Sequence, residues 1–113
     1  MTTEQGQQVD HSALLSQNSG SRTFGPLKLD YTIDIANNQA TISGYLIGVS
    51  IGSKTIDLSS PLTSSIGGTV SLYNVIVDIL PNPGNKTLYI SYKVTFYSNT
   101  ISSANGFPLF HWS

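Results

Sequence analysis

The sequence contains no cysteine, few histidines and few charged residues, and each shortage excludes a class of protein. A chain without cysteine has no thiol nucleophile and no thiolate ligand for a structural zinc ion. The two histidines, His11 and His111, do not form a His-x-x-x-His metal motif. We therefore expect neither a metal site nor a cofactor.

Charged residues make up only 10% of the chain, and the formal net charge is −1. A typical globular domain carries about a quarter charged residues, so this surface consists largely of neutral polar side chains, glycine and tyrosine. The five cations are scattered along the chain: Arg22, Lys28, Lys54, Lys86 and Lys93. Binding to nucleic acid requires a basic stripe that displaces counterions from phosphates, so we do not expect a nucleic-acid partner.

No segment is apolar enough to predict a transmembrane helix. The longest apolar-leaning run, residues 42–51, is interrupted by serines and glycines and is far shorter than the roughly 20 residues needed. The first residues have neither a basic start nor an apolar segment, so we predict no signal peptide in this chain. The composition is compatible with a secreted or surface-acting protein, and the localisation stays open.

The length of 113 residues corresponds to a single domain. Residues 1–22 are mostly polar and bury too little apolar surface to offset the entropy of ordering, so we predict a flexible N-terminal arm there. The remaining residues, 23–113, are expected to form one β-sandwich domain.

Alternation of apolar and polar residues predicts strands in most of this domain. Six strands follow from this period: 27–36, 40–51, 54–58, 69–80, 86–97 and 107–112. Turn residues separate several of them, at 37–38, 52–53, 81–85 and 105–106, and a loop is predicted at 59–68. The apolar phase shifts near Gly44, which indicates a bulge or a bend. We predict a small antiparallel β-sandwich, or a partly open barrel, of about six to seven strands.

No group of residues identifies a chemical reaction. Residues 48–52 match the Gly-x-Ser-x-Gly pattern of a hydrolase nucleophile, but a strand rather than a helix is predicted after Ser50. Asp30 and Asp34 would lie roughly 13 Å apart on one strand, beyond the separation of a glycosidase carboxyl pair. The two histidines lie in the predicted arm and near the chain end, which are poor positions for a catalytic base. We therefore predict that the protein is not an enzyme.

Aromatic residues near the C-terminus and amides near the predicted turn at 81–85 suggest a binding site. Tyrosine and tryptophan bury a ring while keeping a polar tip, which suits a sugar-binding surface. Asparagine amides suit the hydroxyl groups of a sugar. We predict a ligand-binding site formed by Asn82, Asn85, Tyr89, His111 and Trp112.

The composition, free of cysteine and rich in serine, threonine, asparagine and tyrosine, is similar to that of small microbial lectins and adhesin-type domains. The leading hypothesis is a non-enzymatic recognition module for a neutral glycan or a cell-surface receptor. We expect it to be a homo-oligomer, because several weak sites gain avidity together. One alternative is a self-assembling structural or phage-like protein that uses the N-terminal arm. A second is a small pore-forming or insecticidal-type toxin that uses the apolar hairpin 40–58.

Overall fold

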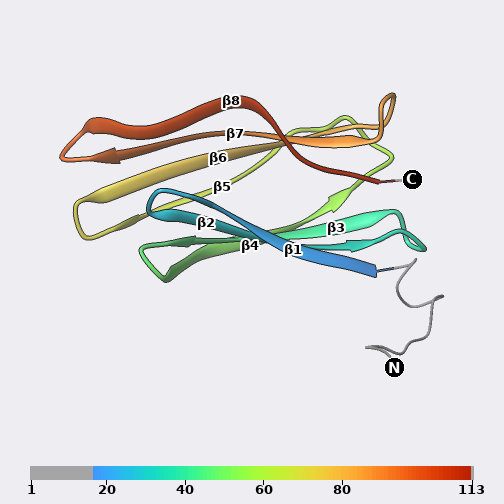
Figure 1. Cartoon of the computed structure of the whole chain (residues 1–113), viewed down its shortest axis with the longest axis horizontal. Helices are drawn as coiled ribbons and strands as arrows, with labels where there is room; N and C mark the ends of the chain where they lie inside the picture. Colours follow the sequence, from blue (N-terminus) through green and yellow to red (C-terminus); the bar gives the residue numbers. More distant parts are fainter. Residues whose placement is uncertain (1–16, 113) are drawn as a thin grey trace.

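The computed structural model describes residues 17–112 and shows two packed β-sheets (Figure 1). The eight strands, in chain order, are β1 (Gln17–Phe24), β2 (Leu27–Asp34), β3 (Gln39–Leu46), β4 (Val49–Asp57), β5 (Ser64–Val70), β6 (Tyr73–Asn82), β7 (Thr87–Phe96) and β8 (Asn99–His111). The prediction of a small antiparallel β-sandwich is confirmed. Within the described residues, no helix is long and apolar enough to span a membrane.

Each sheet is a simple meander of four antiparallel strands. The first has the order β1-β2-β3-β4, and the second has the order β5-β6-β7-β8. Residues 58–63 carry the chain from one sheet to the other, so the edge strands β4 and β5 lie next to each other. On the other side of the sandwich, Phe24 of β1 packs edge-on against Phe107 of β8, with ring centroids 5.2 Å apart. The edge strands β1 and β8 therefore also meet, through side-chain contacts of Phe107.

The core forms where the alternating apolar side chains of the two sheets meet. Burial follows the expected period of two most clearly in β6 and β7. The largest fully buried apolar side chains come from both sheets: Leu27, Leu29, Ile42, Leu46, Leu58, Val77, Ile79, Leu88, Ile90, Val94 and Leu109. Because inward residues alternate with outward ones, the outer face of each sheet carries polar and aromatic side chains, joined on β6 by the exposed Ile76 and Leu80.

The structure has eight strands rather than six or seven, and the two additional ones are the edge strands β1 and β5. Residues 17–22, assigned to the flexible arm by composition, pair with β2 as part of β1. This assignment was wrong because an edge strand can be stabilised by backbone pairing alone and needs no apolar alternation. Residues 1–16, the rest of the predicted arm, lie outside the described residues.

Two predicted turns are bulges within strands. Residues 52–53 lie inside β4, where Gly44 pairs with Gly52 and Tyr45 pairs with Ser50, which leaves Ile51 as an extra residue. The bulge predicted near Gly44 is therefore confirmed. Residues 105–106 lie inside β8, which has 13 residues against the 10 of β7 and three register shifts.

The turns gather at two opposite ends of the sandwich. Four two-residue turns lie at the left of Figure 1, at 25–26, 47–48, 71–72 and 97–98. We call this the hairpin end. The longer connections 35–38, 58–63 and 83–86 lie at the other end together with the C-terminus, and we call this the loop end.

Candidate functional site

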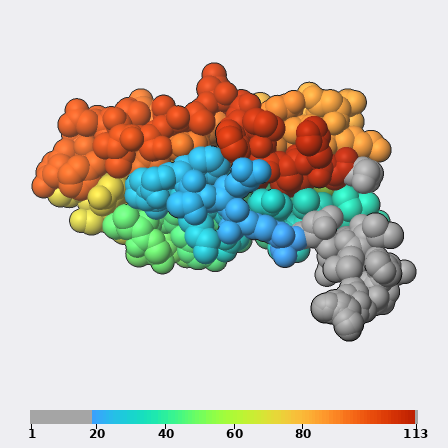
Figure 2. Space-filling model, in the orientation of Figure 1, coloured from blue at the N-terminus to red at the C-terminus, as the bar shows by residue number. Residues whose placement is uncertain are grey.

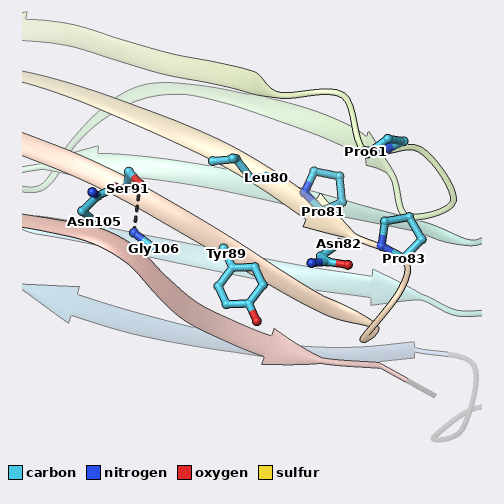
Figure 3. A pocket seen from close by; sticks show the side chains of 9 residues that line it. All are labelled: Pro61, Leu80, Pro81, Asn82, Pro83, Tyr89, Ser91, Asn105 and Gly106. Carbon is cyan, nitrogen blue, oxygen red and sulfur yellow. Dashed lines mark hydrogen bonds between the residues drawn. The ribbon is translucent and has the colours of Figure 1, made fainter.

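A groove of about 380 Å³ lies on the outer face of the β5–β8 sheet, near the loop end (Figure 3). Its lining comes from β6, β7, β8 and the two neighbouring connections: Pro61, Leu80, Pro81, Asn82, Pro83, Tyr89, Ser91, Asn105 and Gly106. The volume lies within the roughly 300–1,000 Å³ range of small-molecule sites.

Register places an apolar pair in the middle of the groove. Leu80 of β6 is directly opposite Tyr89 of β7, and both side chains point outward because their neighbours Ile79 and Ile90 point into the core. Leu80 is 37% exposed although it is apolar. Pro61 and Pro83, from two loops, lie at the end of the groove beyond this pair (Figure 3). The groove thus has rigid apolar walls.

The hydroxyl of Tyr89 is held by the turn between β6 and β7. The side-chain amide of Asn85 donates a hydrogen bond to Tyr89 Oη over 2.8 Å. The tyrosine oxygen is therefore an acceptor in this contact, so its own proton is available to donate elsewhere.

Asn82 presents a second donor because the turn fixes its orientation. Its Oδ1 accepts hydrogen bonds from the backbone N–H of Gly84 (3.0 Å) and of Asn85 (3.3 Å). This leaves the amide nitrogen on the side that faces Tyr89, as Figure 3 shows. The same amide therefore stabilises the turn with its oxygen and offers two N–H groups to the groove.

The far wall is built by the central bulge of β8. Gly106, at φ +68°, donates its N–H to Ser91 Oγ (3.0 Å), and Ser91 Oγ donates to Asn105 Oδ1 (2.9 Å). This chain of hydrogen bonds fixes the direction of the Asn105 amide, so its nitrogen is again available as a donor. A bulge with its glycine at positive φ redirects a side chain in this way.

The groove is lined by neutral residues only. A shallower hollow of about 160 Å³ adjoins it and shares Ser91 and Asn105. Of these two hollows, only the second is lined by charged residues, which are Asp78 and Lys93. Asp78 accepts a hydrogen bond from the hydroxyl of Ser65 over 2.6 Å. The two hollows therefore lie next to each other on the outer face of the sheet.

Comparisons with known protein families, curated proteins and solved structures found no match. The interpretation of the groove therefore depends on its own residues.

The structure brings together three of the five residues that the sequence predicts for the site. Asn82 and Tyr89 line the groove, and Asn85 holds the Tyr89 hydroxyl. His111 does not line the groove, and its Nδ1 lies 2.7 Å from Thr87 Oγ1. Trp112 packs against the edge of the core, with its ring 6.2 Å from that of Phe110. Ligand contacts by His111 and Trp112 stay predictions.

Sequence reasoning missed seven of the nine residues that line the groove: Pro61, Leu80, Pro81, Pro83, Ser91, Asn105 and Gly106. Leu80 belongs to an apolar run of the sequence, and its side chain points outward from β6 whereas those of Val77 and Ile79 point into the core. Asn105 was interpreted as a turn residue.

Across residues 17–112, no three histidine or acidic side chains gather as a metal site requires. Among the carboxylates of residues 17–112, Asp57 alone has a shifted pKa, which lies below its ordinary value because the hydroxyl and the backbone N–H of Ser59 hydrogen-bond to it. This contact lies at the C-terminal end of β4, and neither of its residues lines the groove.

Proposed function

We propose that the protein is a recognition module that binds a neutral glycan in the groove between Leu80, Tyr89 and Asn105. The observation that carries this proposal is the combination of rigid apolar walls with three neutral hydrogen-bond donors. These donors are the amide nitrogens of Asn82 and Asn105 and the hydroxyl of Tyr89.

A sugar ring is complementary to this combination. It has an apolar face of C–H groups, which packs well on an aromatic ring or on proline, and a rim of hydroxyl oxygens that accept hydrogen bonds. The lack of charged groups in the lining disfavours a ligand with a phosphate or carboxylate group. The adjoining hollow supports a ligand longer than one ring, because its lining continues from Ser91 and Asn105.

The protection of the sheet edges favours recognition over assembly through strands. Lys54 of β4 is exposed and lies opposite the buried Ile42, so it occupies an inward-facing position on an edge strand. At an edge of the second sheet, β8 carries three bulges and Pro108. Inward charges, bulges and prolines are the usual means of preventing edge-to-edge pairing. Assembly through the N-terminal arm, the homo-oligomer and the pore-forming alternative stay predictions.

The test is binding of labelled protein to an array of immobilised neutral and acidic glycans, with variants that remove one donor each. Asn82→Asp and Asn105→Asp keep the oxygen that accepts the internal hydrogen bonds and remove the amide N–H groups. Asn74→Asp is the matched control, because Asn74 lies on the same face of β6 and its Oδ1 accepts a hydrogen bond from Thr69 (2.8 Å).

We expect the wild-type protein and Asn74→Asp to bind the same related neutral glycans. Each groove variant should bind them roughly two- to twelve-fold more weakly, which corresponds to one neutral hydrogen bond of about 0.5–1.5 kcal/mol. Equal loss in the control would mean that added negative charge, not the groove, affects binding. Absence of binding by folded wild-type protein to every glycan would overturn the proposal.

A further inference from the structure

The hairpin end carries most of the large apolar side chains that the sandwich exposes. Of the eight exposed large apolar side chains among the described residues, six lie within four residues of one of the four tips: Ile47, Val49, Leu72, Ile76, Tyr97 and Ile101. The other two, Leu62 and Leu80, lie in the connection between the sheets and in the groove. Figure 2 shows the green, yellow and orange surfaces of the hairpins side by side at the left end.

Local conformation does not account for these residues. Ile47 and Tyr97 occupy the first turn positions with φ of +44° and +52°. Such turns strongly favour asparagine, aspartate or glycine, and a β-branched residue at positive φ is strained. Tyr97 is also 63% exposed, so burial compensates little of this cost. Strain combined with exposure points to a functional role for the tips.

The charges near the same tips are mainly positive. Within four residues of a tip lie Arg22, Lys28 and Lys93, against the single carboxylate of Asp30, among the residues that the structure describes. Asp30 lies 3.7 Å from Lys28. Apolar side chains flanked by cations are the combination that binds the interface of an anionic membrane.

We infer that the hairpin end docks on an anionic lipid bilayer, with the tip side chains inserted among the headgroups and the cations above them. A second copy of the chain is a poorer occupant. Two identical ends facing each other would bring together two surpluses of positive charge. Tyrosine and the long cationic side chains are also suited to the polar–apolar boundary of a membrane. This inference does not depend on the glycan groove itself, whose lining lies toward the loop end, but Ile76 and Lys93 also line the hollow that adjoins the groove.

The test is cosedimentation of the full chain with vesicles of phosphatidylcholine alone or with a third of the lipid replaced by phosphatidylserine. The tip variant combines Ile47→Asn, Leu72→Asn and Tyr97→Asn, because asparagine is favoured in turns and should preserve the fold. The control is Leu62→Asn, which removes an apolar side chain that is 75% exposed and remote from the tips.

We expect wild type and Leu62→Asn to bind the anionic vesicles and to dissociate as salt is raised. The tip variant should bind at least about tenfold more weakly, since it loses the buried area of three apolar side chains. A tryptophan probe gives an independent readout in the variant Tyr97→Trp with Trp112→Phe. Its emission should shift to shorter wavelength with anionic vesicles.

Three results would overturn the inference. The first is no binding to anionic vesicles by folded wild type. The second is equal binding by wild type and the tip variant. The third is concentration-dependent dimers of wild type that the tip variant abolishes while vesicles bind neither protein, which would assign the apolar end to a second copy.

Discussion

Replacing Gly44 with alanine tests how closely the two sheets pack beside the β3–β4 bulge. A Cβ atom added at this buried glycine would lie 2.9 Å from Ile66 Cδ1 of the opposite sheet and 3.0 Å from Ile51 Cδ1 and Cγ1. Ile51 is the extra residue of the bulge and Ile66 is buried, so two neighbours must shift together. Overpacking of this kind costs about 1–3 kcal/mol.

The assay is thermal unfolding followed by circular dichroism. For a domain of this size each kcal/mol corresponds to a decrease of roughly 4–8 °C in Tm. The control is Gly68→Ala, because its Cβ would lie 3.4 Å from Ile51 Cγ2, which is ordinary van der Waals contact. We expect Gly68→Ala to leave Tm unchanged or to raise it, since alanine restricts the unfolded chain more than glycine does.

A double-mutant cycle locates the clash. Ile66→Val removes the Cδ1 atom that lies nearest to the new methyl group, so Gly44→Ala should cost less in this background than in wild type. If Gly44→Ala leaves Tm unchanged in wild type, Ile66 and Ile51 can move aside without cost, and the reasoning is refuted.

Two further predictions concern an edge and a turn. Lys54→Val removes the inward-facing charge on the edge strand β4. We expect this variant to associate more strongly with rising concentration in analytical ultracentrifugation, because an inward charge prevents edge-to-edge pairing. A purely monomeric variant would contradict this role of Lys54. The pKa of Asp57 is lowered, so the stabilisation by its contacts with Ser59 is complete above its ordinary pKa of 3.8 and is lost as the pH falls through the lower folded-state value. Asp57→Asn should therefore lower Tm at neutral pH and bring it closer to wild type in acid, and an equal difference at both pH values would contradict this contact.

The sequence predicted the sandwich correctly because the central strands have the clearest alternation. β2 and β7 each pair on both sides and carry strict apolar periods, so their positions are determined locally. The edge strands β1 and β5 were missed since they pair on one side only and contain few inward apolar residues. Their formation depends on pairing with a neighbour, which a local period does not show.

The predicted turns show why glycine is an ambiguous signal. Gly52 and Gly106 both have positive φ, at +118° and +68°, as expected of turn residues. Hairpin turns and β-bulges both use this conformation, so glycine indicates positive φ without indicating which of the two occurs. The true turns at 47–48 and 97–98 begin with isoleucine and tyrosine, which no turn preference predicts.

The candidate site was predicted in part for a physical reason. Asn82, Asn85 and Tyr89 lie close together in the sequence across one turn, so a local argument groups them correctly. The far wall, formed by Ser91, Asn105 and Gly106, depends on how β8 pairs with β7 around a bulge. A local sequence pattern does not give the register between two strands that pair around a bulge. Asn105 was therefore outside the predicted set.

The most direct test of the central claim is a two-dimensional NMR titration of the ¹⁵N-labelled chain with neutral mono- and disaccharides. If the groove binds a neutral glycan, the side-chain amide signals of Asn82 and Asn105 and the backbone signal of Ser91 shift in a saturable way, whereas the side-chain amide of Asn74 does not. If no saccharide shifts these signals, or if the shifts occur only away from the groove, the assignment of the groove as a glycan site is wrong.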